Sequence, residues 1–319
     1  MTDRYGRKID YLRISVTDLC NLRCTYCMPE KGVDKLNHDE ILSFEEILRL
    51  VEIFADIGIN KVRLTGGEPL VRPGIIDLVE MINNINGIES VVMTTNGVLL
   101  KDYADKLKEA GLKRINISLD SLDRKTYKKI TRFDKLNKVL SGIKSSRRAG
   151  LNPVKINTVV MKNFNTDEIY DFVDMAIRNK LEWRFIEFMP LGGVHIVQKD
   201  LFISNKKIKR KIEKKYDLKP IKDAKSLVAN VFRIKGTEAK LGFISPLTHK
   251  FCHKCNRVRM TADGNLIPCL MSEESFNLKK LVRSNESNIK IKEYINQVIN
   301  KKPKEHNSRG SINMSKMGG

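Results

Sequence analysis

Six cysteines of the 319-residue chain fall into two groups of three, spaced as metal ligands are. The first group is Cys20, Cys24 and Cys27, and the second is Cys252, Cys255 and Cys269. Each group is one thiolate short of the four that close a structural zinc site or a fully ligated iron–sulfur cube. Each group therefore predicts a metal position that is left open for a small ligand.

The residues alone leave zinc open as the metal at both groups. His38 could complete a structural zinc knuckle with the first group. The C-x2-C pair at Cys252 and Cys255 is typical of half a zinc ribbon, which His249 or His253 could complete. An open iron–sulfur cube could instead accept an amino and a carboxylate group, and pass an electron to a bound sulfonium.

The charge balance favours anionic partners. The chain has 59 Lys and Arg against 38 Asp and Glu, a formal net charge of +21. Part of the excess lies in residues 206–225, which fit a polyphosphate substrate, RNA or, as we favour, a solvated helix face. Hydrophobic residues make up 41% of the chain, without an apolar run of about 20 residues or a secretory signal pattern. We therefore expect a globular cytoplasmic protein with reduced thiols.

Short β-rich runs alternate with helical patterns through the first half of the chain. The runs cover residues 11–16, 61–65, 90–94, 114–119, 154–160 and 182–188, and Ser43 is a predicted helix N-cap. This alternation predicts parallel strands with right-handed crossovers, and so an α/β fold built on an incomplete (β/α)6 TIM-like barrel over residues 1–190. Residues 191–319 are expected to form a smaller C-terminal α+β module that caps the open side.

Polar residues and glycines cluster where the predicted strands end. Residues 17–27 follow the first strand, GGEP at 66–69 the second and TNG at 95–97 the third, while SLD at 118–120 ends the fourth. The carboxyl ends of barrel strands carry active sites, so we expect the first cysteine group to open onto a pocket lined by these loops. Each loop taken singly also fits an ordinary turn.

The first cysteine motif, with Tyr26 before its last cysteine and a GGEP after the next strand, resembles the radical S-adenosylmethionine (SAM) superfamily. The segments RLTGGEPLVR, KINTVV, RFIEFMP and FCHKCNRVRMTADG, with the pair Gly318 and Gly319, resemble one family within it. That family is the GTP 3′,8-cyclases, which begin molybdenum-cofactor biosynthesis. The resemblance covers nearly the whole chain and is weakest at about 198–230 and 273–302.

The resemblance implies two [4Fe-4S] clusters, one with SAM at Cys20, Cys24 and Cys27, and one with substrate at Cys252, Cys255 and Cys269. It implies SAM contacts from Tyr26, Gly67, Ser118 and Met189. It implies GTP contacts from Arg13, Arg63, Thr94, Lys155, Arg184, Arg257, Val258 and Arg259, to which Lys61 is a further candidate. Catalytic roles are implied for Arg257, Arg259, Gly318 and Gly319. Cations inside β-rich segments are costly unless paired, so the set also indicates an internal anion site.

The implied reaction is hydrogen abstraction from the ribose C3′ of GTP, followed by attack of that carbon on guanine C8. The product would be (8S)-3′,8-cyclo-7,8-dihydroguanosine 5′-triphosphate. The resemblance further implies an electron donor such as flavodoxin or ferredoxin and, downstream, cyclic pyranopterin monophosphate synthase; it implies no membrane and allows a homodimer. Asn265, Ile267 and the ending MSKMGG depart from the family's usual residues. A radical SAM enzyme acting on RNA or a peptide, and a zinc-dependent nucleic-acid-binding protein, stay open.

Overall fold

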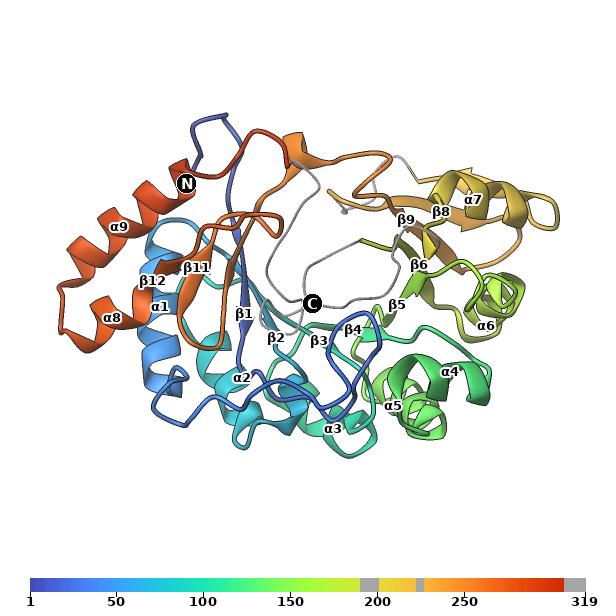
Figure 1. The fold of residues 1–319 in the computed structure, drawn as a ribbon, viewed down its shortest axis with the longest axis horizontal. Coiled ribbons are helices and arrows are strands. Elements are labelled where there is room, and N and C mark those ends of the chain that lie inside the picture. The colour runs from blue at the N-terminus through green and yellow to red at the C-terminus, as the bar shows by residue number, and fades with distance from the viewer. Residues whose placement is uncertain (190–200, 222–226, 307–319) are drawn as a thin grey trace.

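The computed structural model describes residues 1–189, 201–221 and 227–306, and in them one twelve-stranded sheet dominates (Figure 1). The strand order is β12-β11-β10-β1-β2-β3-β4-β5-β6-β9-β8-β7. The eight strands from β10 to β9 run parallel to one another. They are β10 (Arg257–Met260), β1 (Tyr11–Ser15), β2 (Lys61–Thr65), β3 (Ser90–Thr95), β4 (Arg114–Ser118), β5 (Lys155–Val160), β6 (Glu182–Glu187) and β9 (Lys240–Ile244).

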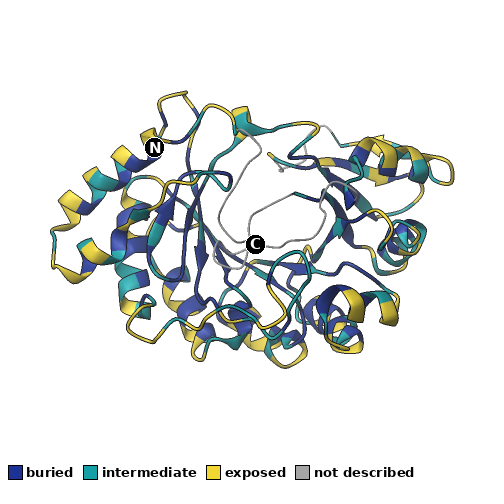
Figure 2. Ribbon diagram, in the orientation of Figure 1, coloured by how far each residue is buried: buried dark blue, intermediate teal, exposed yellow. Residues whose placement is uncertain are grey.

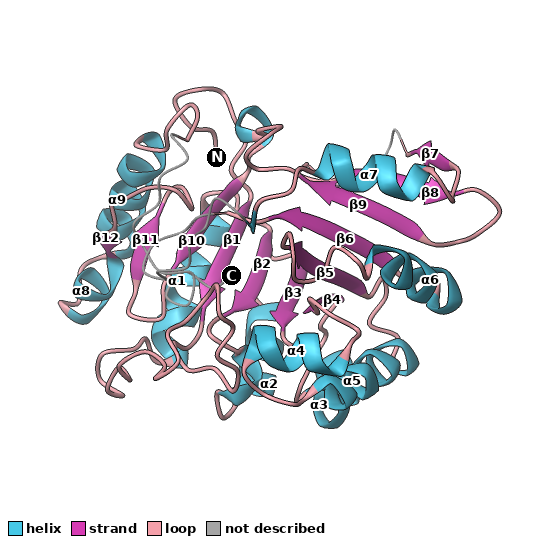
Figure 3. Ribbon diagram, turned by 45° about the vertical axis from the view of Figure 1, so that its right-hand side comes forward, coloured by secondary structure: helices cyan, strands magenta, loops and turns pink. Residues whose placement is uncertain are grey.

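Short antiparallel strands extend the sheet at both edges. They are β11 (Asn265–Ile267) and β12 (Phe276–Asn277) beyond β10, and β8 (Asn230–Ile234) and β7 (Leu218–Pro220) beyond β9. The sheet curves, and most helices line its convex side (Figures 1 and 3). The helices are α1 (Phe44–Asp56), α2 (Ile75–Asn83), α3 (Leu100–Glu109), α4 (Arg124–Thr131), α5 (Leu136–Arg148), α6 (Ile169–Asn179), α7 (Asn205–Glu213), α8 (Leu278–Arg283) and α9 (Asn288–Asn300).

The core lies between the sheet and these helices, because alternate strand residues that face the helices are apolar. Leu12 and Ile14 of β1 are fully buried, and the ring of Trp183 of β6 stacks on Phe172 of α6 at 5.1 Å between centroids. The helices are correspondingly buried on their inner faces and exposed outside (Figure 2). No helix in the described part of the chain is both long and apolar enough to span a membrane.

The structure confirms the predicted α/β class and all six strands, as well as the N-cap at Ser43, whose hydroxyl accepts from the backbone N–H of Glu46. The sequence analysis missed α4. The C-terminal segment also differs from a simple cap, because its strands β9 and β10 join opposite edges of the six-stranded sheet and extend the parallel set. The predicted boundary after Pro190 lies outside the described residues and stays a prediction.

Candidate functional site

The concave face of the sheet is lined by cations held in register. Arg259, Arg13 and Arg63 occupy matching positions on β10, β1 and β2. Because side chains alternate along a strand, these three guanidinium groups lie on the face opposite the apolar core. Among the described residues of the eight parallel strands, Glu182 is the one carboxylate on that face. The face is therefore strongly positive.

The three arginines are buried or nearly so. Arg63 donates to Thr94 Oγ1 at 2.8 Å and to the hydroxyl of Tyr11. Burial, followed by the charge of Arg257, lowers the pKa of Arg259 to about 10, and burial with Arg259 lowers the pKa of Arg13 well below its usual value. Arg259 Nη1 is buried without a hydrogen-bond partner. Such groups call for an anionic ligand.

A second cationic group lies on β5 and β6. Lys155 Nζ lies 2.7 Å from Glu182 Oε2, and Arg184 Nη2 lies 2.5 Å from Glu182 Oε1. Burial and the neighbouring Arg184 lower the pKa of Lys155 to about 8. Asn157, in register with Arg184, has a buried Oδ1 that accepts no hydrogen bond. One carboxylate thus holds two cations in place beside an unsatisfied polar atom.

The first cysteine group lies in the loop after β1, as the sequence predicts. All three are free thiols, and Cys24 interacts electrostatically with both Cys27 and Cys20. Burial raises the pKa of Cys20 to about 11 and, with Cys20 as the next cause, that of Cys27 to about 12. A metal would be needed to hold all three as thiolates, since metal ligands must be deprotonated.

The GGEP segment holds this loop by close backbone contact. Gly67 N donates to Thr17 O at 2.7 Å, and Glu68 N donates to Leu19 O at 2.8 Å. A Cβ on Gly67 would lie 2.2 Å from Leu19 O, so a side chain at residue 67 is excluded. The buried carboxylate of Glu68 accepts from Thr95 Oγ1 at 2.6 Å and Asn96 N at 2.7 Å. GGEP therefore ties the cysteine loop to the end of β3.

The predicted SAM contacts lie in the cysteine loop or at the carboxyl ends of the strands. The Tyr26 hydroxyl donates to Asp120 Oδ2 at 2.6 Å, and its ring meets that of Phe188 edge-on. Ser118 ends β4 on the concave face, and Met189 is the second residue after β6. These residues follow or end different strands, and so lie at the carboxyl ends, where parallel barrels carry their active sites.

The second cysteine group lies on two segments: Cys252 and Cys255 lie between β9 and β10, and Cys269 follows β11. Cys252 begins a short 3-10 helix (Cys252–Lys254), and it interacts electrostatically with Cys269 and Cys255. Burial alone would raise the pKa of the Cys255 thiol, but Lys302 and Arg257 outweigh burial and lower it to about 6. Arg257 lies over the ring of Phe251, while Val258 is buried on the opposite face of β10.

Sequence reasoning missed three residues that the structure brings to these groups: Tyr11, Glu182 and Lys302. For Tyr11 and Glu182 a signal existed, because each lies two positions from a predicted site arginine on the same strand face. Lys302 carries no local signal. The predicted catalytic Gly318 and Gly319 lie outside the described residues.

The histidines that zinc would need, His38, His249 and His253, are exposed. Among described residues no three His, Cys, Asp or Glu side chains converge closely enough to hold one metal ion. Cysteines that bind three different irons of a cube need not converge in this way. The donor set of each group, three free thiols with no fourth ligand converging on them among the described residues, fits an open [4Fe-4S] cluster.

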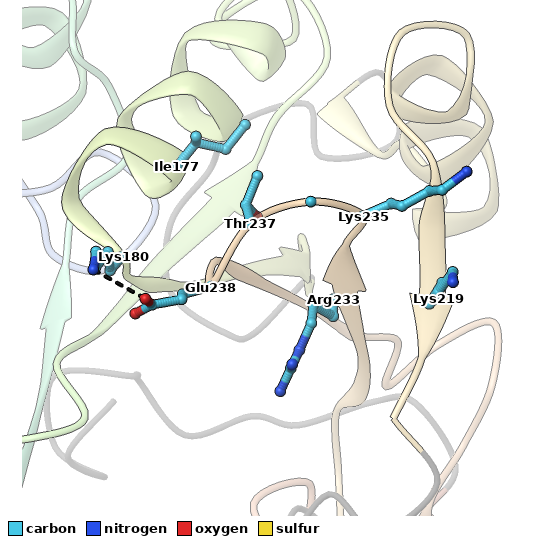
Figure 4. Close-up of a pocket in the computed structure, with 8 residues that line it drawn as sticks. Ile177, Lys180, Lys219, Arg233, Lys235, Thr237 and Glu238 are labelled. Atoms are coloured by element: carbon cyan, nitrogen blue, oxygen red, sulfur yellow. Dashed lines mark hydrogen bonds and ion pairs between the residues drawn. The ribbon is translucent and has the colours of Figure 1, made fainter.

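One surface pocket lies away from this site. Its volume is about 740 Å³, and it is lined by Lys180, Lys219, Arg233 and Glu238 among others (Figure 4). Lys180 and Glu238 precede β6 and β9, so the pocket lies at the amino ends of the parallel strands. The cysteine loop lies at the carboxyl ends, where parallel barrels carry their chemistry.

Comparison with known proteins agrees with this arrangement. Residues 14–176 match the radical SAM superfamily, and residues 181–308 match the family described as Molybdenum Cofactor Synthesis C. The fold is similar to that of Streptococcus suis SuiB bound to S-adenosylmethionine, with a TM-score of 0.62, 16% identity and coverage of 89% of this chain and 68% of SuiB. The chain therefore belongs to the radical SAM superfamily.

Relatives define the family more narrowly. The chain is 47% identical over 325 residues to the GTP 3′,8-cyclase of Alkaliphilus metalliredigens, with both chains covered completely. It is 51% identical over 305 residues to that of Thermodesulfovibrio yellowstonii, covering 95% of this chain and 94% of the relative. Within the superfamily, the chain belongs to the family of GTP 3′,8-cyclases.

Proposed function

We propose that the chain converts GTP to (8S)-3′,8-cyclo-7,8-dihydroguanosine 5′-triphosphate, the first step of molybdenum-cofactor biosynthesis. The observation that carries this proposal is the row of Arg259, Arg13 and Arg63 on three neighbouring strands. Guanidinium groups suit phosphate oxygens, and a triphosphate concentrates enough negative charge to offset several buried cations. A peptide lacks that charge density, and the phosphates of RNA are spread along a chain.

Six cysteines would hold the cofactors. Cys20, Cys24 and Cys27 would bind the [4Fe-4S] cluster that SAM completes, and Cys252, Cys255 and Cys269 would bind the second. The first cluster with SAM supplies the one-electron cleavage that starts a radical reaction, chemistry that belongs to the cofactor. The protein supports it by orienting both molecules and excluding water.

The residues around the clusters divide that task. Tyr26, Gly67, Ser118 and Met189 border the SAM side, at the carboxyl ends of the strands. Arg13, Arg63, Thr94, Lys155 and Arg184 would neutralise the triphosphate, and Arg257 and Arg259 would place the nucleotide beside the second cluster. Glu182 fixes Lys155 and Arg184 so that little rearrangement is needed when the substrate binds.

The same function predicts partners. An electron donor such as flavodoxin or ferredoxin would reduce the first cluster, and cyclic pyranopterin monophosphate synthase would take the product. We place the enzyme in the cytoplasm, where the cysteine thiols that bind iron–sulfur clusters stay reduced.

The deciding experiment is anaerobic reconstitution with iron and sulfide, followed by incubation with SAM and dithionite together with GTP, ATP or RNA. We expect about eight irons per chain, and cyclised product with GTP but not with ATP or RNA. Two zincs without iron would refute the enzyme assignment. Iron-dependent SAM cleavage that modifies RNA in place of GTP would refute the substrate assignment.

A further inference from the structure

Lys302 follows α9, and although its side chain is charged, it is only 2% exposed. Its Nζ donates to Arg257 O at 2.8 Å and to Pro268 O at 2.5 Å. These carbonyls satisfy hydrogen bonds but carry no net charge. Among the described residues no carboxylate forms an ion pair with Lys302. A buried ammonium without a counter-charge is strongly unfavourable.

The position of the two carbonyls relates Lys302 to the second cysteine group. Arg257 is two residues after Cys255, and Pro268 immediately precedes Cys269. Lys302 thus bridges the two segments that carry these ligands. Burial is the largest cause that lowers the pKa of Lys302, and the nearby Arg7 and Arg257 lower it further, whereas the charges of Cys255 and Cys269 act in the opposite direction.

Arg7 offers a useful contrast, because it reaches the same region with its own counter-charge. Its guanidinium forms an ion pair with Asp3 at 2.6 Å and donates to Cys252 O at 3.0 Å. It also donates to Pro303 O at 2.8 Å, which holds the segment after Lys302 in place. Arg7 is paired with a carboxylate, whereas Lys302 has no carboxylate partner among the described residues.

We propose that Lys302 is a positioning residue for the second cluster, and that its ammonium is the counter-charge to the anionic cluster that Cys252, Cys255 and Cys269 hold. A cluster with three thiolate ligands is anionic, and nearby charge sets its reduction potential. The ammonium therefore raises the potential of this cluster and increases its retention. The proposal rests on the assignment of a cluster to this site.

The test uses reconstituted full-length protein with three substitutions at residue 302. Lys302→Met removes charge and donors, Lys302→Gln keeps an N–H donor without charge, and Lys302→Arg keeps both. Lys301→Met is the matched control, because it removes the exposed neighbouring charge. The measurements are iron and sulfide per chain and the midpoint potentials of both clusters by anaerobic redox titration with electron paramagnetic resonance.

We expect Lys302→Met and Lys302→Gln to lower the potential of the second cluster and to leave the first unchanged. Lys302→Arg should restore the potential, and Lys301→Met should match the parent. If the second cluster of Lys302→Gln has the same potential as that of the parent, the proposal is wrong, because the charge of Lys302 would then not set this potential.

If a variant loses the second cluster, the thermal stability of its metal-free form shows whether the loss results from the missing charge or from a weakened fold. If Lys302→Met and Lys302→Gln unfold at the temperature of the parent without metal but retain only about half of its iron, the proposal holds. If both unfold at clearly lower temperature without metal, Lys302 is a structural residue and the proposal is wrong. Zinc in the parent protein would instead contradict the cluster assignment, before any variant is made.

Discussion

Arg259, Arg13 and Arg63 face the same space from neighbouring strands, and their mutual repulsion opposes the folded state when no anion is bound. A cation that is retained in an unfavourable position is informative, because replacing buried charges by apolar groups of similar volume often stabilises a protein. Measuring both stability and substrate turnover therefore distinguishes residues that bind the substrate from residues that stabilise the fold.

Arg259→Met is therefore expected to leave the cofactor-free protein at least as stable as the parent, while product formation falls. Loss of a charge-assisted contact of about 1.5–3 kcal/mol predicts a roughly 10- to 150-fold lower kcat/KM for GTP. Thermal unfolding and product analysis check the two effects, with the exposed Arg147→Met as control. Equal kcat/KM in both variants would remove Arg259 from the substrate site.

Tyr11 gives a spectroscopic view of the same face. Burial alone would raise its pKa, but Arg63, Arg13 and Lys61 outweigh burial and lower it from 10.0 to about 7. Between these pH values the unfolded chain binds more protons at Tyr11 than the folded chain, so the free energy of unfolding should rise with pH in this window.

We predict that the cofactor-free protein shows a tyrosinate absorbance step near pH 7 that is absent from Tyr11→Phe. Denaturant unfolding at several pH values should show the corresponding gain in stability only when Tyr11 is present. The exposed Tyr5→Phe variant should keep both effects. Persistence of the step in Tyr11→Phe would show that the cations do not act on Tyr11.

The cysteines make the simplest prediction at this scale. Cys20→Ser, Cys24→Ser or Cys27→Ser should abolish 5′-deoxyadenosine formation and reduce iron from about eight to about four atoms per chain. The corresponding changes at Cys252, Cys255 or Cys269 should remove a similar amount of iron, spare some SAM cleavage and eliminate cyclised product. Retained 5′-deoxyadenosine formation in the first set of variants would be incompatible with the assignment.

At the scale of elements, local signals were sufficient for most of the fold. Periodicity and capping residues predict β1 to β6 and the start of α1, because these depend on neighbours in sequence. The pairing of β10 with β1 and of β9 with β6 could not be predicted in this way. Such pairing depends on contacts between distant segments, for which a single sequence carries no periodic signal.

The GGEP segment shows how closely two elements must approach. Gly67→Ala would place a Cβ 2.2 Å from Leu19 O, and relieving this overlap requires backbone movement that we estimate to cost about 1–3 kcal/mol. We expect lower thermal stability and loss of iron from the first cluster only. Gly236→Ala is the control. Its Cβ would meet no atom within 4 Å, so this variant tests backbone strain without steric overlap. Similar iron loss in both variants would contradict this explanation.

At the scale of the molecule, the candidate site was predictable as a set of inward-facing cations but not as a network. The strand pattern identifies Lys155 and Arg184, while the carboxylate of Glu182 that joins them is visible only once β5 and β6 are paired. The role of Lys302 is even harder to predict from the sequence. It reaches the second cysteine group because the chain passes α9 and returns to β10, which no local pattern in the sequence encodes.

The Gly–Gly ending stays a prediction from the sequence. Glycine has no side chain to obstruct a crowded pocket, so deletion of Gly318 and Gly319 should leave thermal stability, iron content and GTP affinity nearly unchanged while sharply lowering cyclised product. Anaerobic single-turnover assays check this, and a peptide of sequence SKMGG in excess should restore part of the activity. Full-rate turnover by the truncated chain would make the ending an ordinary terminus.

The parallel pairing of β1 with β10 cannot form until the ribosome has synthesised most of the chain. Tyr11 and Arg257 are neighbours in the sheet, yet they are 246 positions apart in the chain. At about 5–20 residues per second a ribosome needs roughly 12–50 s to make that stretch. Throughout this time β1 presents an unpaired edge, which is prone to associate with other chains. Nascent chains that stall before residue 257 are therefore expected to aggregate or to occupy chaperones.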